Sequence, residues 1–65
     1  MLDSNVVRAT IARLRAEGWH YERDLLTEVA PYQTGDVVEA LQVMLLAECI
    51  RATGEGDKKR YRWIK

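Results

Sequence analysis

The stretch IRATGEGDKKRYRWIK, residues 50–65, decides how the chain folds. Residues 50–53 and 60–63 each alternate apolar with polar side chains, which is the pattern of a half-buried β-strand. Residues 54–57 between them include two glycines, and glycine adopts the positive φ of a tight reversal without steric cost. The stretch therefore predicts a two-stranded β-hairpin.

The second strand of this hairpin separates its aromatic side chains from its arginines. Because successive side chains of a strand point to opposite faces, Tyr61 and Trp63 share one face, and Arg60 and Arg62 share the other. We expect the aromatic face to pack on a core and the arginine face to meet solvent. The basic residues of the hairpin are Arg51, Lys58, Lys59, Arg60 and Arg62.

Apolar residues at helical spacing predict a first helix near the start of the chain. Asp3 or Ser4 can cap it, because a short side-chain oxygen accepts from the unpaired amides of the first turn, and Gly18 can end it. The side chains expected to face the core are Val7, Ile11 and Leu14. Residues 19–21 then form a short link, expected as a brief extended strand.

A second, shorter helix is expected from about Glu22 to about Ala30. Glu22 and Asp24 suit the positive end of the helix dipole, and Pro31 disfavours a helical conformation at the residue before it. Its core-facing residues are expected to be Leu25, Leu26 and Val29.

A third helix is predicted from Gly35 to about Cys49, with Thr34 as its cap. Its most regular apolar row, expected to face the core, is Val37, Ala40 or Leu41, and Met44. The further apolar residues around its circumference are Val38, Val43, Leu45 and Leu46. Two interpretations stay open for them: an interface with a second copy or another protein, or a position beneath the first helix and the hairpin.

The composition is that of a small globular chain, since 48% of the 65 residues are hydrophobic and 31% are charged. We expect a single domain, residues 1–65, of the α+β class. No apolar run approaches the roughly 18 to 20 residues that span a bilayer, so we expect no membrane insertion. The one cysteine, Cys49, permits no internal disulfide and fits a reducing, cytoplasmic location.

Charge is balanced overall but unevenly distributed along the chain. Ten Lys plus Arg match ten Asp plus Glu, so the net charge gives no strong steering toward nucleic acid. There is no Lys or Arg between Asp24 and Ile50, and no acid between Lys58 and Lys65. The sequence thus predicts an acidic middle and a basic end.

The order of elements, with the segment ERDLLTEVAPYQTGDVVEALQVMLLAECIRATGEGDKKRYRWI at residues 22–64, resembles the winged helix-turn-helix superfamily. The resemblance covers residues 4–64. It implies an α+β fold of three helices with a C-terminal two-stranded β-hairpin, the wing. In such proteins the third helix usually lies in the major groove of DNA, and the wing touches the backbone or the minor groove.

The resemblance implies a small DNA-binding protein, a dimeric regulator of transcription whose basic wing holds the phosphate backbone of duplex DNA. Gln33 and Gln42 can read adenine and Thr34 can donate to a phosphate, whereas Asp36 and Glu39 would repel a polyanion. The DNA-contacting residues that it implies are Gln33, Thr34, Gln42, Arg51, Lys58, Lys59, Arg60 and Arg62.

Other interpretations stay open. The chain can be a protein-interaction module, an adaptor or inhibitor that uses the acidic, apolar third helix, or its wing can bind structured RNA. The basic wing can also be a solvated edge whose charges discourage aggregation. Gln33 and Thr34 are in addition ordinary turn and cap residues.

No set of residues predicts catalysis, so we expect no enzyme activity and no cofactor. A phosphate loop and a nucleophile with a matching base are both missing, and His20 lacks a second ligand for a metal. Trp19 and Trp63 are expected mainly in the core, together with Cys49. Tyr32 is expected to pack, with display of its ring to a partner as the alternative.

Overall fold

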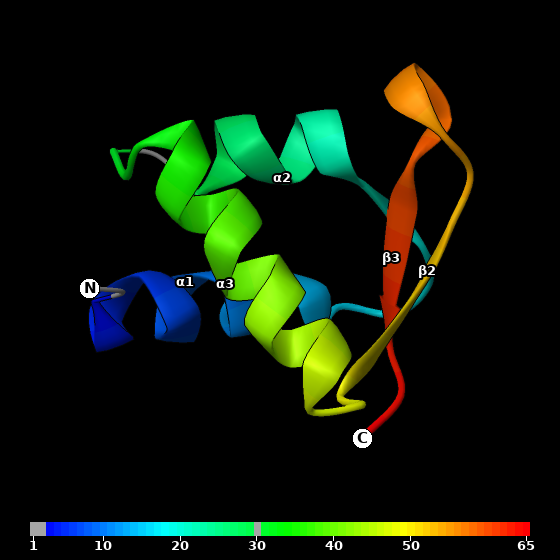
Figure 1. Cartoon of the computed structure of the whole chain (residues 1–65), viewed down its shortest axis with the longest axis horizontal. Helices are drawn as coiled ribbons and strands as arrows, with labels where there is room; N and C mark the ends of the chain where they lie inside the picture. The colour runs from blue at the N-terminus through cyan, green and yellow to red at the C-terminus, as the bar shows by residue number, and fades with distance from the viewer. Residues whose placement is uncertain (1–2, 30) are drawn as a thin grey trace.

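The structure, a computed structural model, describes residues 3–29 and 31–65, which form three α-helices and a three-stranded antiparallel sheet. The predicted α+β class is confirmed. In Figure 1 the helices gather on one side and the sheet stands on the other. No helix within the described residues is long and apolar enough to cross a lipid bilayer. In chain order the elements are α1 (Ser4–Leu14), β1 (His20–Tyr21), α2 (Glu22–Glu28), α3 (Thr34–Leu46), β2 (Ile50–Thr53), the 3-10 turn η1 (Gly56–Lys58) and β3 (Arg60–Trp63).

The sheet has the order β1-β3-β2, so β3 is its central strand. The predicted hairpin is present as β2 and β3, with Ile50 opposite Trp63. The short extended segment predicted at residues 19–21 adds a third strand, because His20 pairs with Tyr61 and Tyr21 pairs with Arg60. The sheet therefore has one strand more than the predicted two-stranded wing. Through β1 it joins the segment between α1 and α2 to β3.

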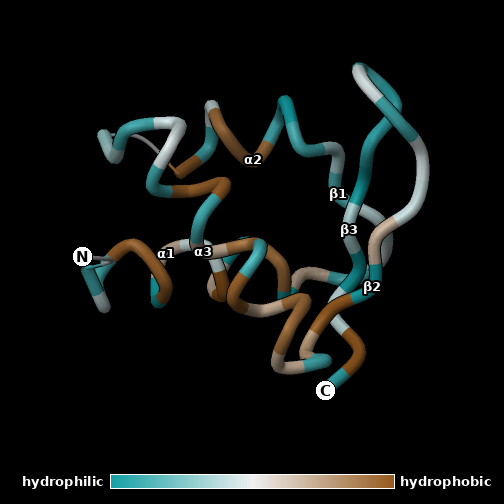
Figure 2. Tube along the Cα trace, in the orientation of Figure 1, coloured by the Kyte–Doolittle hydropathy of each residue, from teal (hydrophilic) through white to brown (hydrophobic). Residues whose placement is uncertain are grey.

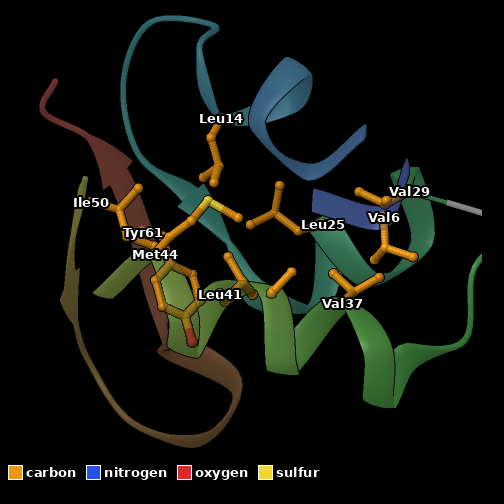
Figure 3. Close-up of a cluster of buried hydrophobic side chains, with 10 residues drawn as sticks. Val6, Leu14, Leu25, Val29, Val37, Leu41, Met44, Ile50 and Tyr61 are labelled. Carbon is orange, nitrogen blue, oxygen red and sulfur yellow. The ribbon is translucent and has the colours of Figure 1, made fainter. Parts of the chain in front are cut away.

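The core lies between the three helices and one face of the sheet. The predicted inward row of α3 is confirmed, since all four of its residues are buried. Figure 3 shows Met44 between Leu14 of α1 and Tyr61 of β3, and Val37 beside Val6 of α1. The buried hydrophobic residues are Val6, Leu14, Leu25, Val29, Val37, Ala40, Leu41, Met44, Ile50 and Tyr61.

α1 is rotated relative to the prediction. Val6 and Thr10 are buried, whereas Val7 and Ile11 are half-buried and pack at the margin of the core. Thr10 can be buried because its hydroxyl donates to the carbonyl oxygen of Val6, 2.8 Å away. The hydrogen bond satisfies a polar atom that would otherwise cost free energy inside the protein.

α1 begins as predicted but ends early. The Asp3 side chain caps it by accepting from the backbone N–H of Asn5 at 2.9 Å. The helix ends at Leu14, although Gly18 does adopt the predicted left-handed conformation, with φ of 96°. His20 Nε2 lies 2.8 Å from the carbonyl oxygen of Ala16, so β1 holds the segment after the helix.

The other two helices also differ from prediction at their ends. α2 begins at Glu22 as predicted and ends at Glu28, and Ala30 lies outside the described residues. Thr34, the predicted cap of α3, is instead its first helical residue, and Gln33 occupies the cap position without a side-chain hydrogen bond.

α3 ends at Leu46, before the predicted Cys49, and the chain reverses there. Glu48 adopts a left-handed φ of 59°, a conformation that usually falls to glycine. Its N–H donates to the carbonyl of Leu45 at 3.1 Å, and the N–H of Cys49 donates to that of Met44 at 3.0 Å. These two bonds are the Schellman arrangement, which satisfies carbonyls at a helix end and directs the chain into β2.

Candidate nucleic-acid interface

The pairing of the strands fixes which residues share each face of the sheet. Residues directly opposite one another on antiparallel strands lie on the same face. Tyr61 is fully buried and marks the face that packs on the helices. The other face, called the outer face below, carries Tyr21 from β1, Arg51 and Thr53 from β2, and Arg60 and Arg62 from β3.

The outer face is basic. Arg51 and Arg62 are direct partners across β2 and β3, and both are exposed. Like charges opposite one another destabilise a sheet pair, so an anion placed between them would relieve repulsion. The strands that the structure describes contain no Asp or Glu. Because strands lie about 4.8 Å apart, these arginines can contact neighbouring phosphates of one nucleic-acid strand.

Two aromatic rings lie beside these arginines. The guanidinium carbon of Arg60 is 5.6 Å from the centroid of the Trp19 ring, and that of Arg23 is 4.9 Å from the Tyr21 ring. Both distances fall within the roughly 6 Å of a cation–π contact. Trp19 was predicted mainly in the core, and this is wrong: it precedes β1 on the side of Arg60, away from the helices, and is 42% exposed.

Sequence reasoning missed Trp19, Tyr21 and Arg23 as members of this surface. The available signal was the alternation of Trp19 and Tyr21 around His20, which places both rings on one face of an extended segment. The pairing of that segment with β3 is what brings the rings to the arginines.

The two lysines near the hairpin tip lie in different environments. Lys58 is exposed on η1. Lys59 is half-buried, and its Nζ lies 5.8 Å from the centroid of the Tyr61 ring, on the helix side of the sheet. The carbonyl oxygen of Lys59 also accepts from the backbone N–H of Glu22 at 2.9 Å. Both lysines were predicted to contact phosphate, and the exposed Lys58 is better placed to do so than the half-buried Lys59.

Tyr61 anchors the central strand. Its hydroxyl donates to Oε2 of Glu22 at 2.6 Å, which joins β3 to the first residue of α2. In Figure 3 its ring lies with Met44 and Ile50 among the buried side chains. Burial, the hydrogen bond to Glu22 and the negative charge of that carboxylate all raise the pKa of the Tyr61 phenol above its ordinary value.

The hairpin tip depends on Gly54. Its φ is 83°, and a Cβ built there would overlap the carbonyl oxygen of Lys58 and lie 2.8 Å from the carbonyl carbon. Only glycine allows the chain to approach itself this closely. The tip is therefore a closed turn, and it fixes the register that places Arg51 opposite Arg62.

The predicted base-reading residues belong to α3 and the turn before it, and not to the sheet. Gln33 precedes the helix, Thr34 opens it and Gln42 lies farther along, and all three are exposed. The first turn of α3 and the sheet stand at opposite sides of the molecule in Figure 1. The structure thus brings Arg51 and Arg62 together and keeps Gln33 and Thr34 apart from them.

The predicted partner surface divides into two parts. Val43 and Leu46 are exposed, Leu46 by 86%, whereas Val38 and Leu45 are half-buried and Leu45 packs against the core. Figure 2 shows the hydrophobic colour on the C-terminal half of α3 and again at the start of β2. An open hollow beside this region is lined by Leu45, Glu48, Ile50, Arg51 and Ile64.

Comparisons of the chain with protein families, with curated proteins and with solved structures returned no match.

Proposed function

We propose that this chain is a small winged-helix protein that binds nucleic acid, duplex DNA in the first instance, through the wing formed by β2, η1 and β3. The observation that carries the proposal is the outer face of the sheet. Arg51, Arg60 and Arg62 share that face, and the strands that the structure describes contain no acid. Three helices, with a hairpin of β2 and β3 after α3 and β1 completing the antiparallel sheet, support the winged-helix arrangement.

The physics of phosphate binding sets the size of the expected effect. Each phosphate that a side chain neutralises contributes about −0.9 to the slope of log affinity against log salt concentration. Arg51, Arg60, Arg62 and Lys58 would together give a slope of about −3 to −4. α3 would contribute less, because Asp36 and Glu39 are exposed on it and repel phosphate, and sequence preference falls to Gln33, Thr34 and Gln42.

A titration of labelled duplex DNA, followed by fluorescence anisotropy at low and moderate salt, tests this proposal. Substituting both Arg51→Ala and Arg62→Ala should weaken binding and make the salt slope about two units shallower. The matched control is the pair Arg8→Ala and Arg15→Ala, which removes the same charge from exposed residues at α1 and should bind almost as the wild type does. Absence of binding at low salt, or equal losses in both pairs, would refute the proposal.

A second function, a protein interface at the C-terminal half of α3, is favoured by the exposure of Leu46 and Val43. A two-fold dimer would cover this surface in both copies at once and would double the number of phosphate contacts. Sedimentation of the wild type and of Leu46→Glu tests the dimer. We expect self-association that the substitution abolishes, and a wild type that stays monomeric at all concentrations would exclude it.

A further inference from the structure

We propose that the outer face of the sheet is a stacking platform for unpaired bases, so that the chain prefers single-stranded nucleic acid to duplex. On this platform a base would stack on Trp19 or Tyr21 while neighbouring arginines hold its phosphates. The inference rests on the proposed function, because it uses the same arginines, and it deepens it by ranking unpaired strands above duplex DNA as the form of nucleic acid that the site binds.

The two rings lie side by side on one surface. Trp19 and Tyr21 are two residues apart on an extended segment, which separates them by about 6 to 7 Å along one face. Tyr21 is the direct cross-strand partner of Arg60, and the Arg60 guanidinium lies 5.6 Å from the centroid of the Trp19 ring. One arginine thus lies next to both rings.

The rings remain accessible although the fold has a core that could take them. Trp19 is 42% exposed and Tyr21 is 36% exposed. Large aromatic side chains contribute most to stability when buried, and a pair of them on one exposed surface is a common feature of binding sites. Both rings stay on the surface because they lie on the outer face, opposite the face that packs on the helices through Tyr61.

The charge of the same surface fits a nucleic-acid strand. Arg23 lies against Tyr21, and Arg51 and Arg62 continue the row of cations across β3 and β2. Glu22, at the start of α2, accepts the hydrogen bond of the buried Tyr61 hydroxyl. Arginine beside an aromatic ring is the combination that single-strand-binding surfaces use, since the ring takes the base and the cation takes the phosphate.

The form of the nucleic acid decides whether the rings contribute. Bases of a duplex are already stacked on their neighbours and offer the protein only their edges, whereas unpaired bases expose their faces. Duplex DNA can therefore use the arginines but not Trp19 and Tyr21. Charge alone does not create this difference, so the rings should set the preference for single strands.

The first experiment measures affinity with and without bases. Labelled oligothymidylate of about eight nucleotides, within the site size of small single-strand-binding folds, is compared with an abasic oligonucleotide and a duplex of the same length. We expect oligothymidylate to bind more tightly than either of the other two. Trp19→Leu should weaken it by about five- to 150-fold, the range of one base–aromatic stack, and should leave the abasic strand unaffected.

The variants include their own controls. Trp19→Phe keeps an aromatic ring and should restore much of the affinity that Trp19→Leu loses. Asn5→Ala removes an exposed side chain on α1, outside both proposed surfaces, and should change nothing. Circular dichroism confirms that each variant is folded, and Tyr21→Ala supplies an independent test if Trp19→Leu is not.

The second experiment reports contact directly. Trp63→Phe leaves Trp19 as the only tryptophan. A base stacked on its ring should quench its fluorescence, with oligothymidylate but not with the abasic strand. Oligouridylate in place of oligothymidylate distinguishes RNA from DNA, and quenching by either supports the platform.

The outcomes separate this inference from the proposed function. Equal binding of duplex, oligothymidylate and abasic strand, with no quenching, would overturn the platform while the role of the arginines stands. Failure of all three to bind at low salt would overturn both, and capture of a protein on this face in place of nucleic acid would do the same.

Discussion

α3 and the outer face of the sheet are both exposed surfaces, yet they differ in charge and in chemistry. The exposed side of α3 carries Asp36 and Glu39 and no Lys or Arg, and it becomes apolar toward Leu46. The outer face of the sheet carries arginines beside aromatic rings. The order of helices and hairpin therefore does not by itself decide which element meets a polyanion. Charge places the candidate site on the sheet, although the family resemblance points first to the third helix.

The largest expected effect separates the two sides of α3. Leu41 is fully buried, and Leu41→Ala should lower the free energy of unfolding by about 2 to 5 kcal/mol, enough to unfold much of so small a protein. Leu46→Ala, on the exposed side, should change it by less than about 0.5 kcal/mol. Urea unfolding at low protein concentration measures both. A large loss for Leu46→Ala would mean that a partner copy buries this side chain.

The next effect tests the turn that shapes the sheet. Gly54→Ala should cost about 2 kcal/mol or more, because the left-handed φ is unfavourable for alanine and the new Cβ meets the backbone of Lys58. Gly35→Ala is the matched control in α3, where a Cβ meets nothing within 4 Å, and it should stabilise by about 0.5 to 1 kcal/mol. Thermal unfolding of both variants distinguishes them, and an unchanged Gly54→Ala would show that the hairpin tip rearranges freely.

Tyr61→Phe should lower the free energy of unfolding by about 1.5 kcal/mol, because Glu22 loses its buried donor and the ring itself is retained. Tyr32→Phe provides the control, since Tyr32 is half-buried at the margin of the core. Chemical denaturation at neutral pH measures the difference. Equal values for the two variants would mean that the hydrogen bond between β3 and α2 contributes nothing.

The same tyrosine predicts a pH dependence. Its pKa is raised in the folded protein, so its contribution is fully present below its unfolded pKa of about 10. Above that pH the unfolded chain loses the proton while the folded one keeps it, and stability should fall by about 1.4 kcal/mol per pH unit. In Tyr61→Phe this part of the alkaline loss should disappear. Identical alkaline profiles would contradict the assignment.

The smallest effect concerns the turn at Glu48 that connects α3 to β2. Glu48→Gly should raise the free energy of unfolding by about 1 kcal/mol, because glycine adopts the left-handed φ without strain. Glu48→Ala removes the same carboxylate but keeps the strain, so it should give no such gain. If both variants gain equally, the charge of Glu48 and not its backbone conformation is the cause.

Local patterns predicted what depends on neighbouring residues. The periodicity of α3 identified Val37 and Met44 as buried together with Ala40 or Leu41, both of which are buried, and the alternation of β2 and β3 identified the hairpin. The rotation of α1 was missed because Thr10 is polar, and its burial depends on the hydrogen bond to Val6 that apolar spacing does not reveal.

Contacts between residues far apart in the sequence could not be predicted from these local patterns. The aromatic part of the candidate site exists because β1 pairs with β3 across most of the sequence, so Trp19 meets Arg60. The position of Lys59 on the helix side likewise follows from the register of β3 and the hydrogen bond to Glu22. Arg60 and Arg62 were predicted to share the outward face, since their alternation is local, whereas the position of Arg51 opposite Arg62 follows from the register of β2 and β3.

The central place of β3 also governs how the chain can fold during synthesis. β1 and β2 each pair with β3, which is the last of the three strands to leave the ribosome. Until then both earlier strands lack their hydrogen-bonding neighbour, and the helices lack the Tyr61 ring that fills their core. The nascent chain therefore cannot form its sheet or complete its core until β3 has been synthesised. We expect the whole domain to fold in one late, cooperative step.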